Sequence, residues 1–188
     1  MISSLKKTAI ATAAASSILA TAANAADIYQ GGVVVPSATN LVFYSSDIKI
    51  SIGNINFTDC NLILTSDIIP DGNGGMNIQV TDGNIGGEAF CTLLTFTNFP
   101  WTSHIPSINV PNPPENTLVP ITINNAVLQA GFFGSCGPGP IPMMYSNGSS
   151  VPNTDASSFK FATPLTPGNC SITGTLSTQM PYSTEDIV

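Results

Sequence analysis

His104 is the only histidine in the chain, and imidazole is the side chain used most often as a catalytic base near neutral pH. Its neighbour Ser103 carries a hydroxyl that such a base could activate. Adjacent residues of an extended chain point to opposite sides, however, so these two side chains cannot act on each other. The sequence also lacks the Gly-x-Ser-x-Gly elbow of serine hydrolases. We therefore predict no catalytic residue, and we expect His104 to lie in a surface loop with its role left open.

The carboxylates form no evident acid–base pair or metal site. Asp71 opens the run Asp-Gly-Asn-Gly-Gly, which resembles the start of a calcium-binding loop. That loop requires glycine at its sixth position and glutamate at its twelfth, where this chain has Met76 and Asp82. A tight turn is the better interpretation, and adventitious calcium binding stays open. Glu185 and Asp186 are adjacent but lie in a terminal segment that nothing holds rigid, so we expect no glycosidase pair there.

The chain contains four cysteines, Cys60, Cys91, Cys136 and Cys170. In an exported protein an even number of cysteines is typical of a disulfide framework, whereas zinc sites need closer spacings such as Cys-x-x-Cys. Three pairings are open. We favour Cys60–Cys91 with Cys136–Cys170, because each bond then ties neighbouring β segments within one half of the chain. Each closed loop spans about 30 residues and would stabilise the fold by roughly 3 kcal/mol. No cofactor is expected.

The first 25 residues contain the three parts of a secretory signal peptide in the correct order. Lys6 and Lys7 provide a basic start, residues 8–22 form an uncharged, alanine-rich run, and Ala23-Asn24-Ala25 matches the small-x-small cleavage motif. The run is shorter than the roughly 20 strongly apolar residues of a membrane anchor. We therefore expect export by the Sec route with passage through the periplasm. The mature chain would begin at Ala26, lack a transmembrane segment, and be secreted or displayed on the cell surface.

The mature chain is poor in charge and strongly acidic. It contains no arginine, and its basic residues are Lys49 and Lys160 against 11 aspartates and glutamates, which gives a net charge of −9. Two basic side chains cannot neutralise a row of phosphates, which excludes nucleic acid as a partner. Attraction to an anionic lipid surface is excluded for the same reason. The expected partners are hydrophobic surfaces or other components of the cell surface or matrix, and self-association stays open.

Past the signal, apolar residues recur in short alternating runs without a helical pattern. The isoleucines of residues 48–52 alternate with polar residues, which places one face of a strand inward. Residues 89–96 and 126–133 are further predicted strands, rich in β-forming types. Turn signals follow about every 8–12 positions, as in antiparallel sandwiches and barrels. We predict one all-β domain over residues 26–180, an antiparallel β-sandwich of the Ig-like or Greek-key type with disulfides, followed by a flexible acidic tail at 181–188.

Four interruptions of the strand pattern shape this prediction. Residues 70–75 form a strong turn, Gly53-Asn54 shifts the phase as a bulge would, and Asp82-Gly83 is a hairpin signal. The segment 99–114 contains five prolines, so we expect an extended loop or edge segment there rather than a central strand. A long proline-rich crossing suits strands that switch between two sheets, which favours the sandwich over the barrel.

Phe99 and Trp101 flank Pro100 at the start of this segment. In an exposed proline-rich loop the two rings would form an apolar contact surface. A tryptophan in such a position more often closes the end of a sandwich core, and we favour that interpretation for Trp101. A role of Phe99 and Trp101 as apolar contacts is therefore the less favoured of the two interpretations.

Several short motifs follow one another along the mature chain. They are a first cysteine-bearing strand at Cys60, a Gly-x-x-x-Cys run at 87–91, Asn-x-Pro-Trp at 98–101, Cys-Gly-Pro at 136–138, and Gly-Asn-Cys-x-Ile at 168–172. In these motifs the chain resembles the PraB family, the protein activators of alkane oxidation, over residues 56–180. The resemblance implies a small secreted or surface-associated protein without known catalytic residues. It further implies that the protein promotes growth on hydrophobic substrates such as alkanes, and that it contributes to adhesion and to the biofilm matrix.

An alternative is a fimbrial (pilus) subunit assembled by donor-strand exchange, in which an N-terminal extension completes a neighbour's sheet. Residues 28–35 or 48–57 could supply that strand. The C-terminus lacks the alternating aromatic run that a pilus chaperone grips, which argues against this alternative. An enzyme is the third alternative, and the scattered carboxylates and the single histidine argue against it.

Overall fold

The computed structural model describes residues 28–30, 33–88, 90–107, 118–146, 157–161, 164–165, 170–178 and 186–187. The expected signal peptide, residues 1–25, lies outside the described residues. The described part consists of strands joined by turns and short 3₁₀ helices. These elements are β1 (Ile28–Gln30), β2 (Val33–Val35), β3 (Ala38–Ile52), β4 (Ile55–Pro70), β5 (Met76–Gly87), η1 (Cys91–Leu93), β6 (Thr95–Thr97), β7 (Trp101–Ile105), β8 (Leu118–Gln129), η3 (Gly131–Phe133), β9 (Ser135–Ser146), β10 (Ser158–Phe161), β11 (Pro164–Leu165), β12 (Cys170–Thr178) and β13 (Asp186–Ile187).

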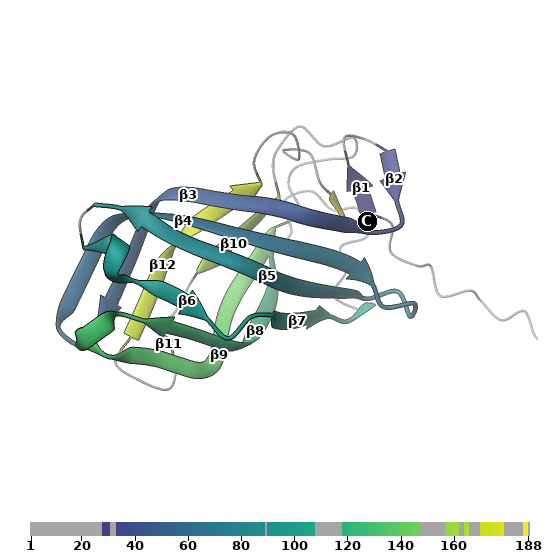
Figure 1. The fold of residues 1–188 in the computed structure, drawn as a ribbon. Coiled ribbons are helices and arrows are strands. Elements are labelled where there is room, and N and C mark those ends of the chain that lie inside the picture. Colours follow the sequence, from purple (N-terminus) through teal and green to yellow (C-terminus); the bar gives the residue numbers. More distant parts are fainter. Residues whose placement is uncertain are drawn as a thin grey trace, which may run out of the picture.

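Eight of the strands form one closed, antiparallel ring (Figure 1). Their order around the ring is β3, β4, β5, β7, β8, β9, β10 and β12, and β12 pairs again with β3. The ring closes because β10 pairs with β9 on one side and with β12 on the other. β6 lies beside β8, and β11 beside β12, as short additions. The prediction of an all-β antiparallel domain is confirmed, but the sandwich is wrong, because the fold is an up-and-down β-barrel.

The barrel closes because its strands are long and bent. β3 and β4 run for 15 and 16 residues, which is longer than the short strands expected from the sequence. Register shifts interrupt the β3–β4 pairing between Ile48 and Ile50, and the β12–β3 pairing between Thr173 and Ser177. Each such bulge adds local twist and bends the strand, and repeated bends coil a sheet until its edges meet. A sandwich would instead need its strands to end or switch sheets at these places.

Two glycine-containing pairs have roles opposite to those expected. Gly53-Asn54, predicted as a bulge, is the tight turn between β3 and β4, where Gly53 adopts a φ of +61°. Asp82-Gly83, predicted as a hairpin turn, lies inside β5 next to a register shift against β4. Glycine next to asparagine or aspartate occurs both in tight turns and in bulges, so these residue types alone do not distinguish the two.

The proline-rich segment also differs from expectation, because Trp101–Ile105 is the ring strand β7, between β5 and β8. Pro100 and Pro106 flank this strand rather than interrupt it, so each of its five residues keeps its backbone N–H for pairing. All five pair with β5. The loop assignment for residues 99–114 is therefore wrong over 101–105, and residues 108–114 lie outside the described part.

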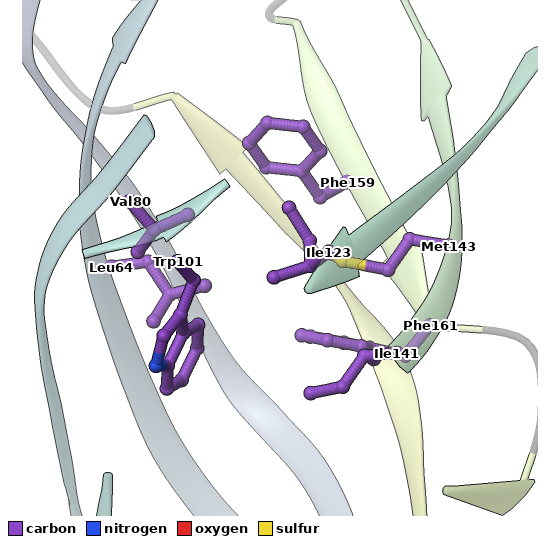
Figure 2. A pocket seen from close by; sticks show the side chains of 8 residues that line it. All are labelled: Leu64, Val80, Trp101, Ile123, Ile141, Met143, Phe159 and Phe161. Atoms are coloured by element: carbon purple, nitrogen blue, oxygen red, sulfur yellow. The ribbon is translucent and has the colours of Figure 1, made fainter. Parts of the chain in front are cut away.

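The barrel interior is filled with side chains, the largest of which are Trp101, Tyr145, Phe43 and Phe159. Among these side chains lies a cavity of about 10 Å³ with an apolar lining (Figure 2). Its lining residues are Leu64, Val80, Trp101, Ile123, Ile141, Met143, Phe159 and Phe161. A cavity of this size has room for about one water molecule, and an apolar lining gives that water no partner. The interior is therefore a packed core rather than a ligand chamber.

A small second sheet joins the first and last strands of the described chain. β1 pairs with β2 on one side and with β13 on the other, which places Ile28 opposite Ile187. The Ile28 side chain is buried and belongs to the hydrophobic core. Two residues of the expected flexible tail, Asp186 and Ile187, thus form a strand, while residues 181–185 lie outside the described part. In Figure 1 this sheet lies at the opposite end of the barrel from the teal and green turns of η1 and η3.

Candidate functional site: an apolar tip braced by two disulfides

Two disulfide bonds brace one end of the barrel. Cys60 on β4 is joined to Cys91, the first residue of η1, and Cys136 on β9 is joined to Cys170 at the start of β12. The Cα atoms of the two pairs lie 5.5 Å and 6.1 Å apart, within the usual range for a disulfide. This is the sequential pairing favoured from the sequence, and all four cysteines are buried.

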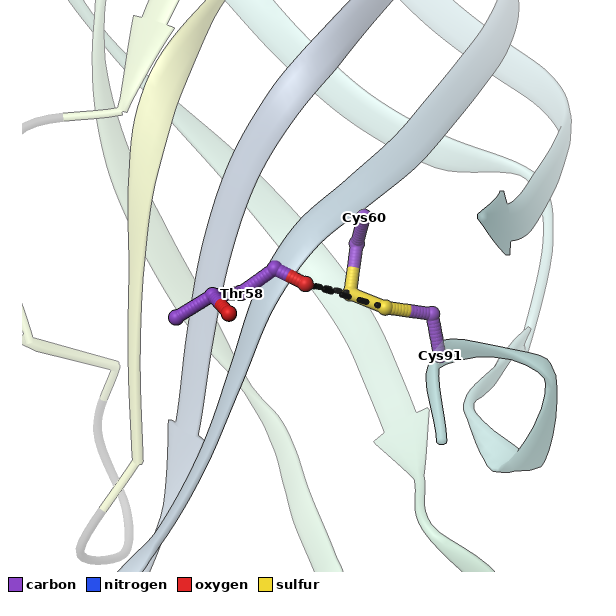
Figure 3. The surroundings of a disulfide bond; sticks show 3 residues. All are labelled: Thr58, Cys60 and Cys91. Atoms are coloured by element: carbon purple, nitrogen blue, oxygen red, sulfur yellow. Dashed lines mark hydrogen bonds between the residues drawn. A yellow bond between two sulfur atoms is a disulfide. The ribbon is translucent and has the colours of Figure 1, made fainter. Parts of the chain in front are cut away.

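Figure 3 shows how the first bond holds η1 against the barrel wall. The Thr58 carbonyl oxygen lies 3.6 Å from Cys91 Sγ and 3.9 Å from Cys60 Sγ. A disulfide sulfur carries no proton, so this is a packing contact that covers the bond. The backbone of η1 is also fixed from within, because the Cys91 N–H donates to the Glu88 carbonyl and the Leu94 N–H donates to the Cys91 carbonyl. η1 is therefore a hydrogen-bonded turn fastened to β4.

Four large apolar side chains protrude at this end, and we name them the apolar tip. Phe132 is 85 % exposed, Phe90 66 %, Leu93 41 % and Ile55 36 %. Phe90 and Leu93 lie at the two ends of η1, Phe132 lies in η3, and Ile55 begins β4. Each exposed ring leaves a large apolar area in water, and such rings indicate a contact surface when several apolar side chains gather at one place.

Strand pairing and ring contacts place the segments of the apolar tip beside one another. β6 follows η1 closely and pairs with the end of β8, with Thr95 opposite Gln129, just before η3. The ring of Phe133, which follows Phe132, meets the ring of Phe57 on β4 with centroids 6.2 Å apart. The start of β4, η1 and η3 therefore share one end of the barrel, as Figure 1 shows. A cluster of this kind differs from single exposed apolar residues, which are common on any protein surface.

Sequence reasoning does not identify the apolar tip, because Phe90 and Phe132 stand in runs of β-forming residues. The local signal that could indicate it is glycine. Gly131 and Gly134 adopt φ angles of +54° and +107° on either side of the two phenylalanines of η3. An aromatic pair bracketed by glycines favours a turn that leaves the sheet over a continuous strand. The strand predicted over 126–133 accordingly ends at Gln129.

Phe99 and Trp101, the contact residues considered from the sequence, pack against the core of the barrel. Trp101 is 2 % exposed, and its Nε1–H donates to the Thr97 carbonyl at 2.9 Å. Its ring stacks on Phe99 with centroids 4.5 Å apart and meets Phe96 edge-on at 4.8 Å. Phe99 is half-buried in this cluster. Trp101 therefore sits in the core, where it cannot touch a partner.

His104 lies on the outer face of β7 and is tied to the turn between β4 and β5. Its Nε2 lies 2.8 Å from Asp71 Oδ2, while Asp71 Oδ1 accepts hydrogen bonds from the N–H groups of Asn73 and Gly75 at 2.7 Å and 2.9 Å. The hydrogen bond from His104, followed by those from the two amides, lowers the pKa of the Asp71 carboxyl below its usual value. Ser103 points into the interior, so it does not face the imidazole. The arrangement is a clasp between a turn and a strand.

We expect this clasp to stabilise the barrel only while the Asp71 carboxylate is ionised. Because folding holds the pKa of Asp71 below its unfolded value, the stabilisation is present above the unfolded pKa and is lost as pH falls through the lowered, folded pKa. Asp71→Asn should therefore be less stable than the wild type at about pH 6, and the two should converge towards about pH 2. Urea unfolding of both proteins at the two pH values measures this, and a difference that does not change with pH would contradict it.

Asp71 and His104 are both residue types that bind metal ions, but two such side chains are fewer than a metal site usually needs. Within the part of the chain that the structure describes, no group of three or more His, Cys, Asp or Glu side chains could hold a metal ion. No helix among the described residues has the length and apolar character needed to cross a membrane.

Comparison with known proteins gives a match at the level of the family. Searches of curated proteins and of solved structures found no match. The model of the family described as alkane oxidation protein activator PraA/PraB-like matches residues 2–184, which is nearly the whole chain. That span includes the barrel, both disulfides and the apolar tip, and it confirms the resemblance found in the short motifs. The chain belongs to the PraA/PraB-like family of alkane oxidation protein activators.

Proposed function

We propose that this protein is exported and promotes the use of alkanes without catalysing a reaction, by adsorbing to apolar surfaces such as hydrocarbon droplets. The observation that carries the proposal is the apolar tip, which stands at a disulfide-braced end of a barrel whose interior is already full. The family supplies the biological setting, alkane oxidation. Adhesion to hydrophobic surfaces and a place in the biofilm matrix would follow from the same property.

The filled interior favours adsorption over carriage of an alkane inside the barrel. The cavity among Trp101, Phe159, Phe161 and other apolar side chains has a volume of only about 10 Å³. Eight-stranded barrels that carry ligands need an open chamber at their centre. To admit a hydrocarbon chain, this barrel would have to expel core side chains, each of which contributes roughly 1.5–3 kcal/mol by its burial. An apolar substrate therefore meets the protein from outside.

The outer wall of the barrel suits a water–hydrocarbon boundary because it is polar but nearly uncharged. The side chains between the inward-facing residues of β12 are Ser171, Thr173, Thr175 and Ser177. Across the whole chain only 8 % of the residues are charged. Charged groups are the most costly to desolvate near an apolar phase, whereas hydroxyls cost less and still keep the wall wet. Such a wall stays hydrated in water, and it adds little desolvation cost when the apolar tip approaches a hydrocarbon surface.

The alternative functions lack an observation of comparable weight. Donor-strand exchange requires a sheet edge that a neighbour's strand can fill, whereas the eight ring strands all come from this chain and close on each other through β10 and β12. A Ser-His-Asp arrangement would need a nucleophile beside the other imidazole nitrogen of His104, but the neighbouring Ser103 points into the interior. A non-enzymatic surface protein is the function that we carry forward.

The interfacial tension of a hexadecane drop in a solution of the purified chain from Ala26 onward tests this proposal. We expect the tension to fall at micromolar protein, because the exposed apolar side chains leave water at the drop surface. The clarified water phase should contain no stoichiometric complex of protein and hexadecane, because the interior is full. A wild-type protein that leaves the tension unchanged would overturn the proposal, and a soluble one-to-one complex would favour a carrier instead.

A further inference from the structure

We infer that the apolar tip, formed by Ile55, Phe90, Leu93 and Phe132, is the surface that makes contact, and that it meets an uncharged hydrocarbon surface end-on. This inference rests on the proposed function, which requires adsorption but does not say where on the barrel it occurs. The observations that carry it are the protrusion of the apolar tip, the charges beside it and its position relative to the chain ends.

The two rings of the apolar tip are largely exposed, which suits a continuous apolar phase better than a single small molecule. Phe132 is 85 % exposed, and its ring contacts that of its neighbour Phe133 at a centroid distance of 4.0 Å. Phe90 is 66 % exposed beside η1. A small molecule is bound by a concave pocket that surrounds most of its surface. A protruding ring, in contrast, becomes buried only by entering a phase that closes around it.

The charges beside the apolar tip are two carboxylates and one ammonium group. The segments that carry it, residues 52–60, 87–94 and 129–136, contain two charged residues, Asp59 and Glu88, and both are exposed. Lys49 of β3 lies next to the first of these segments, where it lines a surface hollow with Asn56, Phe57 and Thr58. Together the three groups leave one net negative charge, which an anionic phospholipid surface would still repel. A liquid alkane is uncharged and exerts no such repulsion. The apolar tip therefore fits a neutral hydrocarbon surface rather than an anionic membrane.

The apolar tip has a rigid base, and the described ends of the chain lie away from it. Cys60–Cys91 fastens η1 to β4, and Cys136–Cys170 fastens β9 to β12 close to η3. The small sheet of β1, β2 and β13 lies at the opposite end of the barrel (Figure 1). End-on contact would therefore leave this sheet facing water, and would bring all four tip residues to the hydrocarbon together.

The double variant Phe90→Ser, Phe132→Ser tests the inference against a matched control, Ile69→Ser, Leu118→Ser. The control removes two apolar side chains, Ile69 with 40 % exposure and Leu118 with 50 % exposure. They lie at the end of β4 and at the start of β8, which are the strand ends away from the apolar tip. We expect the tip variant to need a protein concentration at least about tenfold higher than the wild type for the same fall in hexadecane interfacial tension. The control should stay within about twofold of the wild type. All four substituted residues are exposed, so urea unfolding should show wild-type stability for both variants.

The outcomes separate this inference from the proposed function. If the wild type adsorbs and both variants adsorb equally well, or lose adsorption equally, the inference is overturned and the proposed function stands. If the wild type does not adsorb, the proposed function itself fails. Sedimentation with phosphatidylglycerol vesicles at low salt completes the test, and we expect no binding by the wild type. Vesicle binding that the Phe90→Ser, Phe132→Ser variant abolishes would overturn the inference by assigning the apolar tip to membranes.

Discussion

Replacing Trp101 with alanine is expected to lower the free energy of unfolding of the barrel by about 3–5 kcal/mol. The indole is 2 % exposed and packs against the rings of Phe96 and Phe99, with centroid distances of 4.8 Å and 4.5 Å. Alanine would leave a void that the barrel cannot close, because β5 and β8 on either side of β7 are held by their other neighbours. It would also leave the Thr97 carbonyl without the indole donor. Urea denaturation followed by circular dichroism measures the loss.

Trp101→Phe is the matched control for this prediction. Phenylalanine keeps an aromatic ring in the cluster but has no N–H to donate, so we expect a loss of about 1–2 kcal/mol. Equal losses for the two variants would mean that the hydrogen bond to Thr97, and not the packing of the ring, accounts for the contribution of Trp101. A loss of less than about 1 kcal/mol for Trp101→Ala would contradict the placement of the indole in the core.

The local character of the fold can be predicted from the sequence. The structure buries Ile48, Ile50 and Ile52 and leaves Lys49 exposed between the first two, as the alternation predicts. This alternation depends only on the pleat of an extended chain, which neighbouring residues determine. The turn at residues 70–75 is local in the same sense, because the Asp71 carboxylate accepts hydrogen bonds from the backbone N–H groups of Asn73 and Gly75 in the same turn.

The closure of the sheet is not local, and the same patterns cannot predict it. Sandwich and barrel strands alternate in the same way, and the two folds differ in where continuous strands bend. Gly174, with a φ of +142°, lies within the irregular stretch of β12, where a Cβ atom would collide with Ile48 of β3. Both the positive φ and the approach of β3 favour glycine here, and the second requirement is set by residues of a distant segment. In the sequence the same glycine marks a turn as well as it marks a bulge.

The apolar tip shows a second limit of sequence reasoning. Phe132 protrudes because the chain leaves the sheet at Gly131 and returns at Gly134, whereas Phe133 beside it packs onto Phe57. The residue type is the same at both positions, so composition cannot tell which ring faces water. Exposure is decided by the direction of the backbone at η3, and that direction depends on the β8–β9 pairing that η3 connects.

Removing the Cys60–Cys91 disulfide is the second change with a large expected effect. The double variant Cys60→Ala, Cys91→Ala opens a loop between residues that are 31 positions apart, and it should lower the free energy of unfolding by about 3–4 kcal/mol by raising the entropy of the unfolded chain. Alanine is preferable to serine because both positions are buried, and two hydroxyls there would lose their hydration. Urea denaturation under non-reducing conditions measures the loss.

The companion variant Cys136→Ala, Cys170→Ala opens a loop of nearly the same length, 34 positions, so the argument from chain entropy predicts a nearly equal global loss. The two variants should differ locally, because only the first frees η1 from β4. The backbone N–H groups of residue 91 and Leu94 are hydrogen-bonded within this turn. Their amide hydrogen exchange should therefore accelerate in the first variant and not in the second. With η1 released, the apolar tip loses part of its fixed geometry, and adsorption to hexadecane should weaken more in the first variant. Equal exchange at η1 in both variants would contradict the assignment of Cys60–Cys91 as the bond that holds the apolar tip in place.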